Sequence, residues 1–223
     1  MGKKRKNSNY KYKPQHVIDK SESRKAGFFG FIIAIIAIFV CVIVAVALHP
    51  KQKTVFVEMK VKDYGTIVLE LDGESAPITV DNFVNLVEDG FYDGLTFHRV
   101  MSNFMIQGGC PDGNGTGNSG KYIKGEFSKN NVDNDIKHLR GTISMARSDD
   151  YNSASCQFFI CNADYPSLDG NYAAFGHVVE GIEVVDAITS GTVGYANAYS
   201  GAIYDKSKQA VIEYIKVLDN YNK

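Results

Sequence analysis

The sequence has 223 residues, with 24 Lys and Arg, 25 Asp and Glu, and a formal net charge of −1. That balance excludes a strongly basic nucleic-acid-binding protein and an acidic disordered tail. The charge is uneven: residues 1–25 carry nine basic and two acidic side chains, residues 26–48 carry none, and residues 49–223 carry a net charge of −8. The sequence therefore predicts two oppositely charged pieces on either side of an apolar segment.

The apolar segment at 26–48 reads AGFFGFIIAIIAIFVCVIVAVAL. As a helix it is about 35 Å long, which exceeds a hydrocarbon core of about 30 Å. The alternative is a cleaved signal peptide, because Ala45-Val46-Ala47 resembles a cleavage site. However, the apolar run is longer than the usual one of about 7–15 residues. We therefore expect an uncleaved transmembrane helix that acts as a signal anchor.

The flanks of this segment predict its orientation. Nine basic residues precede it, whereas only Lys51 and Lys53 follow closely. By the positive-inside rule, residues 1–25 form a cytoplasmic tail, which is polar and predicted to be disordered. We expect residues 49–53 to be a linker and residues 54–220 to form an extracytoplasmic domain of a single-pass cell-membrane protein.

Short strands dominate the predicted domain. Apolar and polar residues alternate over Thr54–Val61, which is typical of a half-buried strand, and Thr66–Leu71 is predicted to pair with it. Further apolar runs between Gly and Asn residues predict strands at Leu95–Val100, Phe104–Gln107, Gly141–Ala146, Gln157–Cys161, Ala173–Val179 and Ala210–Leu218.

Two helices are expected among these strands. The first has Ser75 as its predicted N-cap, Pro77 in its first turn and Gly90 at its end. The second is predicted over Ile182–Thr189. Many short strands with two separated helices are typical of an antiparallel barrel or sandwich that carries helices.

Residues 108–121, GGCPDGNGTGNSGK, match two phosphate-binding patterns by spacing alone. Neither leads into an amphipathic helix, and Tyr122 stands where a P-loop needs Ser or Thr. We interpret the segment as a wide turn with several glycines at positive φ. The His and Cys residues lack metal-ligand spacing, and Cys110, Cys156 and Cys161 are expected to be buried, unpaired thiols.

The stretch FHRVMSNFMIQGG at 97–109 places Phe104, Met105 and Gln107 shortly after Arg99. Strand alternation brings these side chains to one surface only if the chain bends at residues 102–103. The alternative is a plain hairpin with an Arg side chain that reaches out to solvent. The local pattern alone leaves both interpretations open.

Three segments closely resemble the cyclophilin-type peptidyl-prolyl cis-trans isomerases. They are FHRVMSNFMIQGGCPDGNGTG at 97–117, GTISMARSDDYNSASCQFFICN at 141–162 and LDGNYAAFGHVVEGIEVVDAI at 168–188. The resemblance covers about Thr54–Leu218, and its MAR…NSAS…QFF version is similar to bacterial members. It implies an eight-stranded antiparallel barrel capped by two helices, and isomerase activity on X-Pro bonds without a cofactor or metal.

The resemblance also implies the site residues. Arg99 is the expected catalytic arginine, and Gln107 is expected to hold the substrate backbone. The substrate groove and proline pocket would be lined by Phe104, Met105, Ala146 (through its main chain), Gln157, Phe159, Leu168 and Tyr172. The expected partners are proline-containing peptides and unfolded or folding proteins.

Three positions depart from many eukaryotic members of the family. Ser167 stands in place of a Trp, Arg147 in place of an Asn, and Tyr172 in place of a His. Because the Trp position matters to cyclosporin recognition in the family, cyclosporin binding stays open. The residues that the resemblance assigns to catalysis are all present.

Two alternatives to an enzyme remain. One is a proline-peptide binding module whose catalysis is incidental, and the other is a membrane-tethered scaffold that has lost activity. Binding alone does not need Arg99, and an inactive relative is expected to lose that Arg or the pocket aromatics. The sequence therefore favours a membrane-anchored isomerase that acts on proteins folding at the outer face, where uncatalysed prolyl steps take tens of seconds.

Overall fold

The computed structural model describes residues 31, 35–36, 54–219 and 221. The chain divides into two units, Met1–Pro50 and Lys51–Lys223. In the first unit, Phe31, Ile35 and Ile36 are helical and exposed. The rest of the predicted tail, membrane helix and linker lies outside the described residues. Within the described part of the chain, no helix has the length and apolar character needed to span a bilayer.

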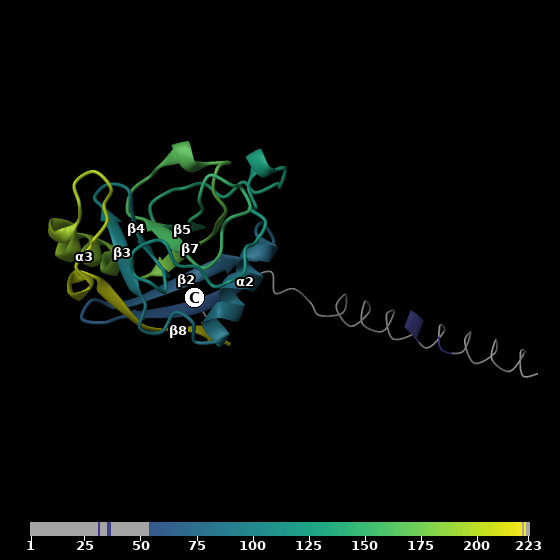
Figure 1. Cartoon of the computed structure of the whole chain (residues 1–223), viewed down its shortest axis with the longest axis horizontal. Helices are drawn as coiled ribbons and strands as arrows, with labels where there is room; N and C mark the ends of the chain where they lie inside the picture. Colours follow the sequence, from purple (N-terminus) through teal and green to yellow (C-terminus); the bar gives the residue numbers. More distant parts are fainter. Residues whose placement is uncertain (1–30, 32–34, 37–53, 220, 222–223) are drawn as a thin grey trace, which may run out of the picture. The chain divides into compact units, whose positions relative to one another are not determined.

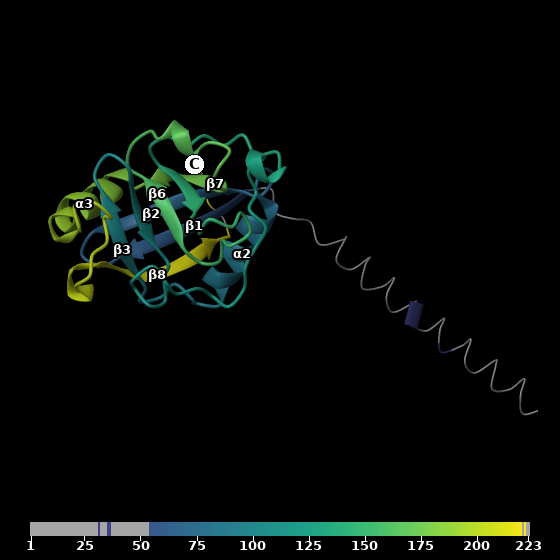
Figure 2. The same cartoon turned by 45° about the horizontal axis from the view of Figure 1, so that its top comes forward.

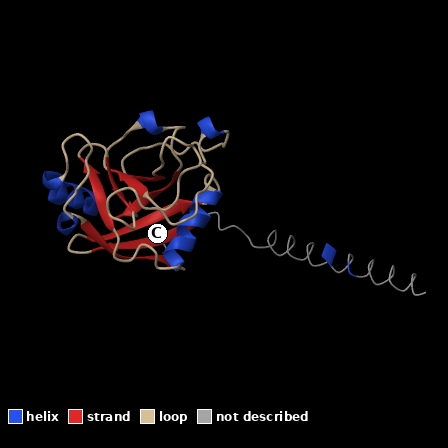
Figure 3. Ribbon diagram, viewed as in Figure 1, coloured by secondary structure: helices blue, strands red, loops and turns tan. Residues whose placement is uncertain are grey.

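Eight antiparallel strands build the second unit and close into a barrel (Figures 1 and 3). They are β1 (Thr54–Val61), β2 (Gly65–Asp72), β3 (Thr96–Met101), β4 (Met105–Gly108), β5 (Thr142–Met145), β6 (Phe158–Cys161), β7 (Ala174–Glu180) and β8 (Ala210–Leu218). Their order around the barrel is β1-β2-β7-β5-β6-β4-β3-β8, and β1 pairs with both β2 and β8. The predicted antiparallel barrel is confirmed, and the alternative of a sandwich is excluded.

Alternation along the strands explains the barrel core. In β1, Val55, Val57, Met59 and Val61 are buried, and the residues between them are at least partly exposed. Period-two burial sends these four side chains to the barrel interior. The interior also holds several aromatic rings, such as that of Phe83, which contacts neighbouring core rings.

Helices cover the barrel at opposite ends, as Figures 1 and 2 both show. They are α2 (Pro77–Glu88) and α3 (Ile182–Thr192), and α3 continues three residues past the predicted end at Thr189. Short 3-10 helices lie in the loops at Ser128–Asn130, Pro166–Leu168, Val193–Tyr195 and Lys206–Lys208. Both helices expected from the sequence are therefore present.

The predicted N-cap of α2 is wrong. No side chain caps the helix locally, and the Ser75 hydroxyl instead donates to the carboxylate of Asp72 at 2.7 Å. The buried carboxylate of Glu126 accepts from the backbone N–H groups of Ile78 (3.0 Å) and Thr79 (2.7 Å), and from the Thr79 hydroxyl (2.7 Å). The first turn is thus satisfied by a residue far along the chain, which local sequence spacing does not reveal.

The glycine-rich segment forms the expected wide turn. Gly109, Gly113, Gly115 and Gly120 all have positive φ, which confirms that interpretation. At Gly109 a Cβ atom would lie only 2.7 Å from the carbonyl oxygen of Cys156. Glycine is required there both for its backbone conformation and for the close approach of the next segment.

Three cysteines of the barrel unit are free and buried. Burial raises the pKa of Cys156 to about 11 and that of Cys161 to about 12. Because the thiolate is the reactive form, both side chains act as small apolar groups at neutral pH. The prediction of buried, unpaired thiols is confirmed for Cys110, Cys156 and Cys161.

Candidate active site

The hairpin of β3 and β4 places the first candidate residues. The chain turns at residues 102–104, where Asn103 has φ 56°, a conformation that Asn tolerates well. Arg99 then lies opposite Gln107, and Met101 lies opposite Met105. The bend that the sequence requires is therefore present, and it brings Arg99 and Gln107 to one surface.

Neutral groups hold the Arg99 guanidinium. Its Nε donates to the carbonyl oxygen of Ser200 at 2.7 Å, and its Nη1 donates to Gln107 Oε1 at 3.1 Å. Its Nη2 lies 3.2 Å from the sulfur of Met101. Burial lowers the pKa of Arg99, yet an arginine stays protonated at neutral pH. No ion pair within residues 54–219 involves Arg99, so its charge is not neutralised by a carboxylate.

A directional chain of amides extends from Arg99. Gln107 Nε2 donates to Gln157 Oε1 at 3.0 Å, and Gln157 Nε2 donates to the carbonyl oxygens of Gly115 and Gly117, each at 2.9 Å. A guanidinium only donates and a carbonyl only accepts. The two ends therefore fix the orientation of both amides and tie Arg99 to the glycine-rich turn.

A cavity of about 260 Å³ opens beside Arg99. It is lined by Arg99, Phe104, Met105, Gln107, Ala146, Arg147, Phe159, Leu168 and Tyr172. Met105 and Phe159 belong to a small apolar cluster that is separate from the main barrel core. At the rim, Phe104 packs on Tyr165 with ring centres 4.3 Å apart. The cavity therefore combines apolar side chains with two guanidinium groups, those of Arg99 and Arg147, and with the amide of Gln107.

A second, larger cavity of about 520 Å³, lined mostly by residues with polar side chains, lies next to the first. Gln107, Ala146 and Arg147 line both cavities, so they form the wall between them. Gln157 lines the larger cavity and not the smaller one. The N–H of Ala146 donates to the Gln157 carbonyl oxygen at 2.9 Å. The structure thus brings eight of the nine predicted residues around the small cavity and places the ninth, Gln157, next door.

A comparison with known protein families identifies the kind of protein that carries these two cavities. The family described as cyclophilin type peptidyl-prolyl cis-trans isomerase/CLD matches residues 56–212, which is most of the chain. This chain belongs to the cyclophilin-type peptidyl-prolyl cis-trans isomerases. Its activity is the cis–trans isomerisation of peptide bonds that precede proline.

Bacterial and protozoan proteins are similar to this cyclophilin. A peptidyl-prolyl cis-trans isomerase of Helicobacter pylori is 43% identical over 153 residues, which cover 68% of this chain and 90% of that protein. One from Synechococcus elongatus is 49% identical over 129 residues, covering 57% and 84%. A crystal structure of a Cryptosporidium parvum cyclophilin-type isomerase, in the presence of the dipeptide Ala-Pro, superposes with a TM-score of 0.63. It is 29% identical and covers 74% of this chain and 99% of its own.

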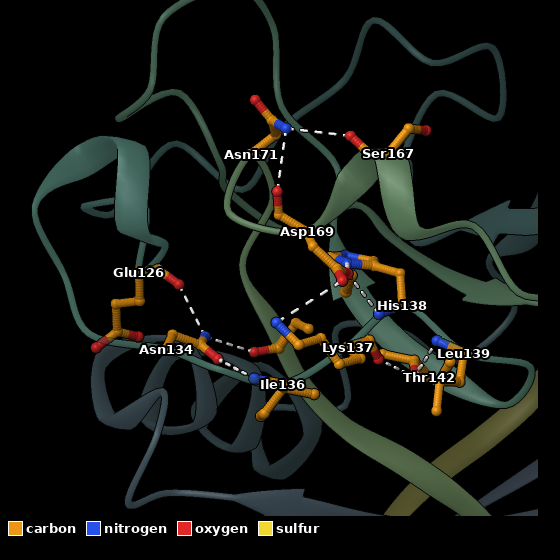
Figure 4. A network of polar contacts seen from close by, with 12 residues as sticks. Glu126, Asn134, Ile136, Lys137, His138, Leu139, Thr142, Ser167, Asp169 and Asn171 are labelled. Atoms are coloured by element: carbon orange, nitrogen blue, oxygen red, sulfur yellow. Dashed lines mark hydrogen bonds and ion pairs between the residues drawn. The ribbon is translucent and has the colours of Figure 1, made fainter.

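A polar network that includes His138 and Asp169 (Figure 4) contacts the cyclophilin pocket through Phe159. The Asp169 carboxylate accepts from the backbone N–H of His138 (2.8 Å) and lies 3.0 Å from its ring Nδ1. The other ring nitrogen lies 3.0 Å from the Ser144 hydroxyl, and the ring stacks on Phe159. Burial lowers the pKa of His138. Burial also acts to raise the pKa of Asp169, but the hydrogen bonds from His138 outweigh it and the pKa is lowered.

The loop that carries two pocket residues is tightened by one amide. The Asn171 side chain donates to the carbonyl oxygens of Ser167 (3.1 Å) and Asp169 (3.2 Å), as Figure 4 shows. These bonds close the turn on which Leu168 and Tyr172 stand. The pocket wall that carries Leu168 and Tyr172 is thus held by hydrogen bonds from one side chain to the main chain of its own loop.

Two contributors to the cyclophilin site were not predicted. Arg147 lines both cavities, whereas the sequence identified it only as a departure from the family pattern. Ser200 contacts Arg99 through its carbonyl oxygen. A main-chain contact leaves no side-chain signal in the sequence, so only the structure reveals it.

Proposed function

We propose that this cyclophilin accelerates X-Pro isomerisation in proteins that fold at the outer face of a membrane, with Arg99 as the catalytic residue. The observation that carries the proposal is a guanidinium without an ion pair at the edge of an apolar cavity. Residues 26–48, which carry no charge, would anchor the enzyme.

The reaction sets the size of the effect required. The barrier to rotation about a peptide bond is about 18–20 kcal/mol, because the nitrogen lone pair is delocalised into the carbonyl. A turnover near ~10³ s⁻¹ needs a barrier of roughly 13 kcal/mol. The enzyme must therefore remove about 5–7 kcal/mol of the uncatalysed barrier, without a covalent intermediate or a general base.

Arg99 suits this task because it acts on the twisted state. As the peptide bond rotates, the proline nitrogen becomes pyramidal and regains its lone pair. The guanidinium then donates to that nitrogen and stabilises the twisted state more than either planar isomer. Because Arg99 is held by neutral acceptors, its position is set before the substrate binds.

The other predicted residues take supporting roles in this proposal. Four apolar side chains grip the proline ring and exclude water: Phe104, Met105, Phe159 and Leu168. Gln107 holds the substrate backbone while the other end rotates, and Ala146 offers its main chain. Gln157 and Tyr172 complete the groove. Proline-containing peptides and unfolded or folding proteins are the proposed partners.

The catalytic assignment is tested by Arg99→Ala and Arg99→Lys in the full-length protein, solubilised in mild detergent. A protease-coupled assay on an X-Pro test peptide should show kcat/KM lowered by about 10²–10³-fold in Arg99→Ala, the usual cost of one preorganised donor. Arg99→Lys should recover little, because an ammonium lacks the fork that reaches both acceptors. Arg140→Ala, at an exposed ion pair with Asp186, is the control. Undiminished activity in Arg99→Ala would show that the assignment is wrong.

The membrane proposal needs a separate experiment in cells that express the full chain. Tyr199, 94% exposed, is replaced by Cys in one variant, and Ser8 is replaced by Cys in another. A membrane-impermeant maleimide should label Tyr199→Cys in intact cells and Ser8→Cys only after permeabilisation. The opposite pattern would reverse the orientation, and release of the protein without detergent would contradict the anchor.

A further inference from the structure

Arg147 follows β5 and stands in the wall between the two cavities. Its guanidinium carbon lies over three aromatic rings, at 5.3 Å from the ring centre of Phe127, 4.9 Å from that of Tyr151 and 4.7 Å from that of Tyr172. Such stacking orients a guanidinium without neutralising its charge. Arg147 is thus a cation with a fixed position in the groove.

The hydrogen bonds of Arg147 leave one donor unused. Its Nε and Nη2 both donate to the carbonyl oxygen of Asn171, at 3.0 and 2.9 Å. Its Nη1 donates to the carbonyl oxygens of Ser148 (2.7 Å) and Asp149 (3.3 Å). A guanidinium has five N–H donors, so one N–H of Nη2 remains after these four bonds. No ion pair in the barrel unit's described residues includes Arg147.

The charges that line the cavities are unbalanced. In the smaller cavity, Arg99 and Arg147 are the charged residues, and no acidic side chain lines it. In the larger cavity, Asp150 is the one acidic lining residue, and its carboxylate accepts from the backbone N–H of Asn152 at 2.8 Å. A recess lined by one sign of charge concentrates the field at its mouth. The smaller cavity therefore presents positive potential to a bound peptide, whereas Arg147 and Asp150 line the larger cavity with opposite charges.

We propose that Arg147 is a specificity-determining residue that favours substrates with a carboxylate side chain next to the proline. With the proline in the small cavity, a flanking residue enters the larger one past the wall that Arg147 forms. A Glu side chain there accepts from the unused N–H of Arg147 in a charge-assisted hydrogen bond. A Lys side chain there meets the fixed charge of Arg147 instead. This inference rests on the proposed proline site.

The test compares peptides rather than absolute rates. Two series carry Glu, Gln or Lys either just before or just after the proline, and kcat/KM is measured with the full-length protein in mild detergent. In one series Glu should exceed Gln by roughly three- to ten-fold, and Lys should fall below Gln. Added salt should shrink the ratio of Glu to Gln, because it screens the charge.

Variants then assign the preference to one side chain. Arg147→Met should bring the ratio of Glu to Gln close to one, and Arg147→Gln, which can still donate to carbonyls, should do the same if the Met variant does not fold. Arg147→Lys should keep part of the ratio, and Asp150→Asn should increase it. Arg140→Met, which lines neither cavity, is the control and should leave the ratio unchanged.

Two results would overturn the proposal. One is the absence of a Glu preference in both series, and the other is a preference that persists in Arg147→Met or Arg147→Gln. Failure of the unmodified protein to isomerise any peptide, including those with Gln, would instead count against the proposed function itself. The ratio cancels a general loss of activity, so a merely structural role of Arg147 would not change it.

Discussion

Replacement of Glu126 by Gln tests how α2 is held to the barrel. The carboxylate is 2% exposed and accepts three hydrogen bonds from the first turn of the helix. An amide presents one oxygen in place of two, so at least one N–H of the helix faces an NH2 group. Hydrogen bonds to a charged group contribute about 1.5–3 kcal/mol each, and the charge also interacts with the helix dipole.

The expected loss in the free energy of unfolding is about 3 kcal/mol. For a domain of this size, 1 kcal/mol shifts Tm by about 2–4 °C, so Glu126→Gln should lower Tm by roughly 9 °C. Thermal unfolding is followed by far-UV circular dichroism of the full-length protein in detergent. Ser75→Ala, at the cap that the sequence suggested, should cost only about 0.5–1 kcal/mol. If Ser75→Ala destabilised as much as Glu126→Gln, the long-range cap would be refuted.

Three further predictions concern pH and reactivity. Gln157→Glu should lose about ten-fold in kcat/KM at pH 7, because a carboxylate cannot donate to the two glycine carbonyls. The activity should recover in part as the pH falls toward about 4.3, where half of the carboxyl groups are protonated and can donate one hydrogen bond. A pH-independent loss would contradict the directional amide chain. Burial lowers the pKa of His98 to about 4, so as the pH falls the unfolded state binds the proton before the folded state does. The free energy of unfolding should therefore fall by about 3 kcal/mol between about pH 6.5 and pH 4. Denaturant unfolding of His98→Gln should show a correspondingly smaller fall. In a Cys41→Ser background, an aromatic disulfide reagent at pH 8 should react with Cys156 and Cys161 only as fast as the protein unfolds; rapid labelling under native conditions would contradict their burial.

Strand positions were predictable because their signal is local. Alternation predicted Thr54–Val61, and an apolar run predicted Ala210–Leu218, with the bounds that the structure has. The FHRV stretch left open whether the chain bends to bring Gln107 beside Arg99, and the structure shows that it does. The cap of α2 was not predictable, because Glu126 acts across about fifty positions of sequence. The role of Arg147 in the site was not predicted for the same reason. Its aromatic partners come from three separate segments, and the residue at position 147 alone does not indicate them.

Barrel closure has a consequence for how unfolded chains, the proposed partners, would meet this enzyme. Incoming polypeptides carry unpaired backbone groups that readily add to an open sheet edge, and such addition seeds aggregation. Here β1 is paired on both sides, and every other strand of the barrel unit also has two neighbours. The sheet offers no free edge to a client. A peptide that enters the two cavities therefore contacts side chains and loops, and finds no unpaired strand to extend.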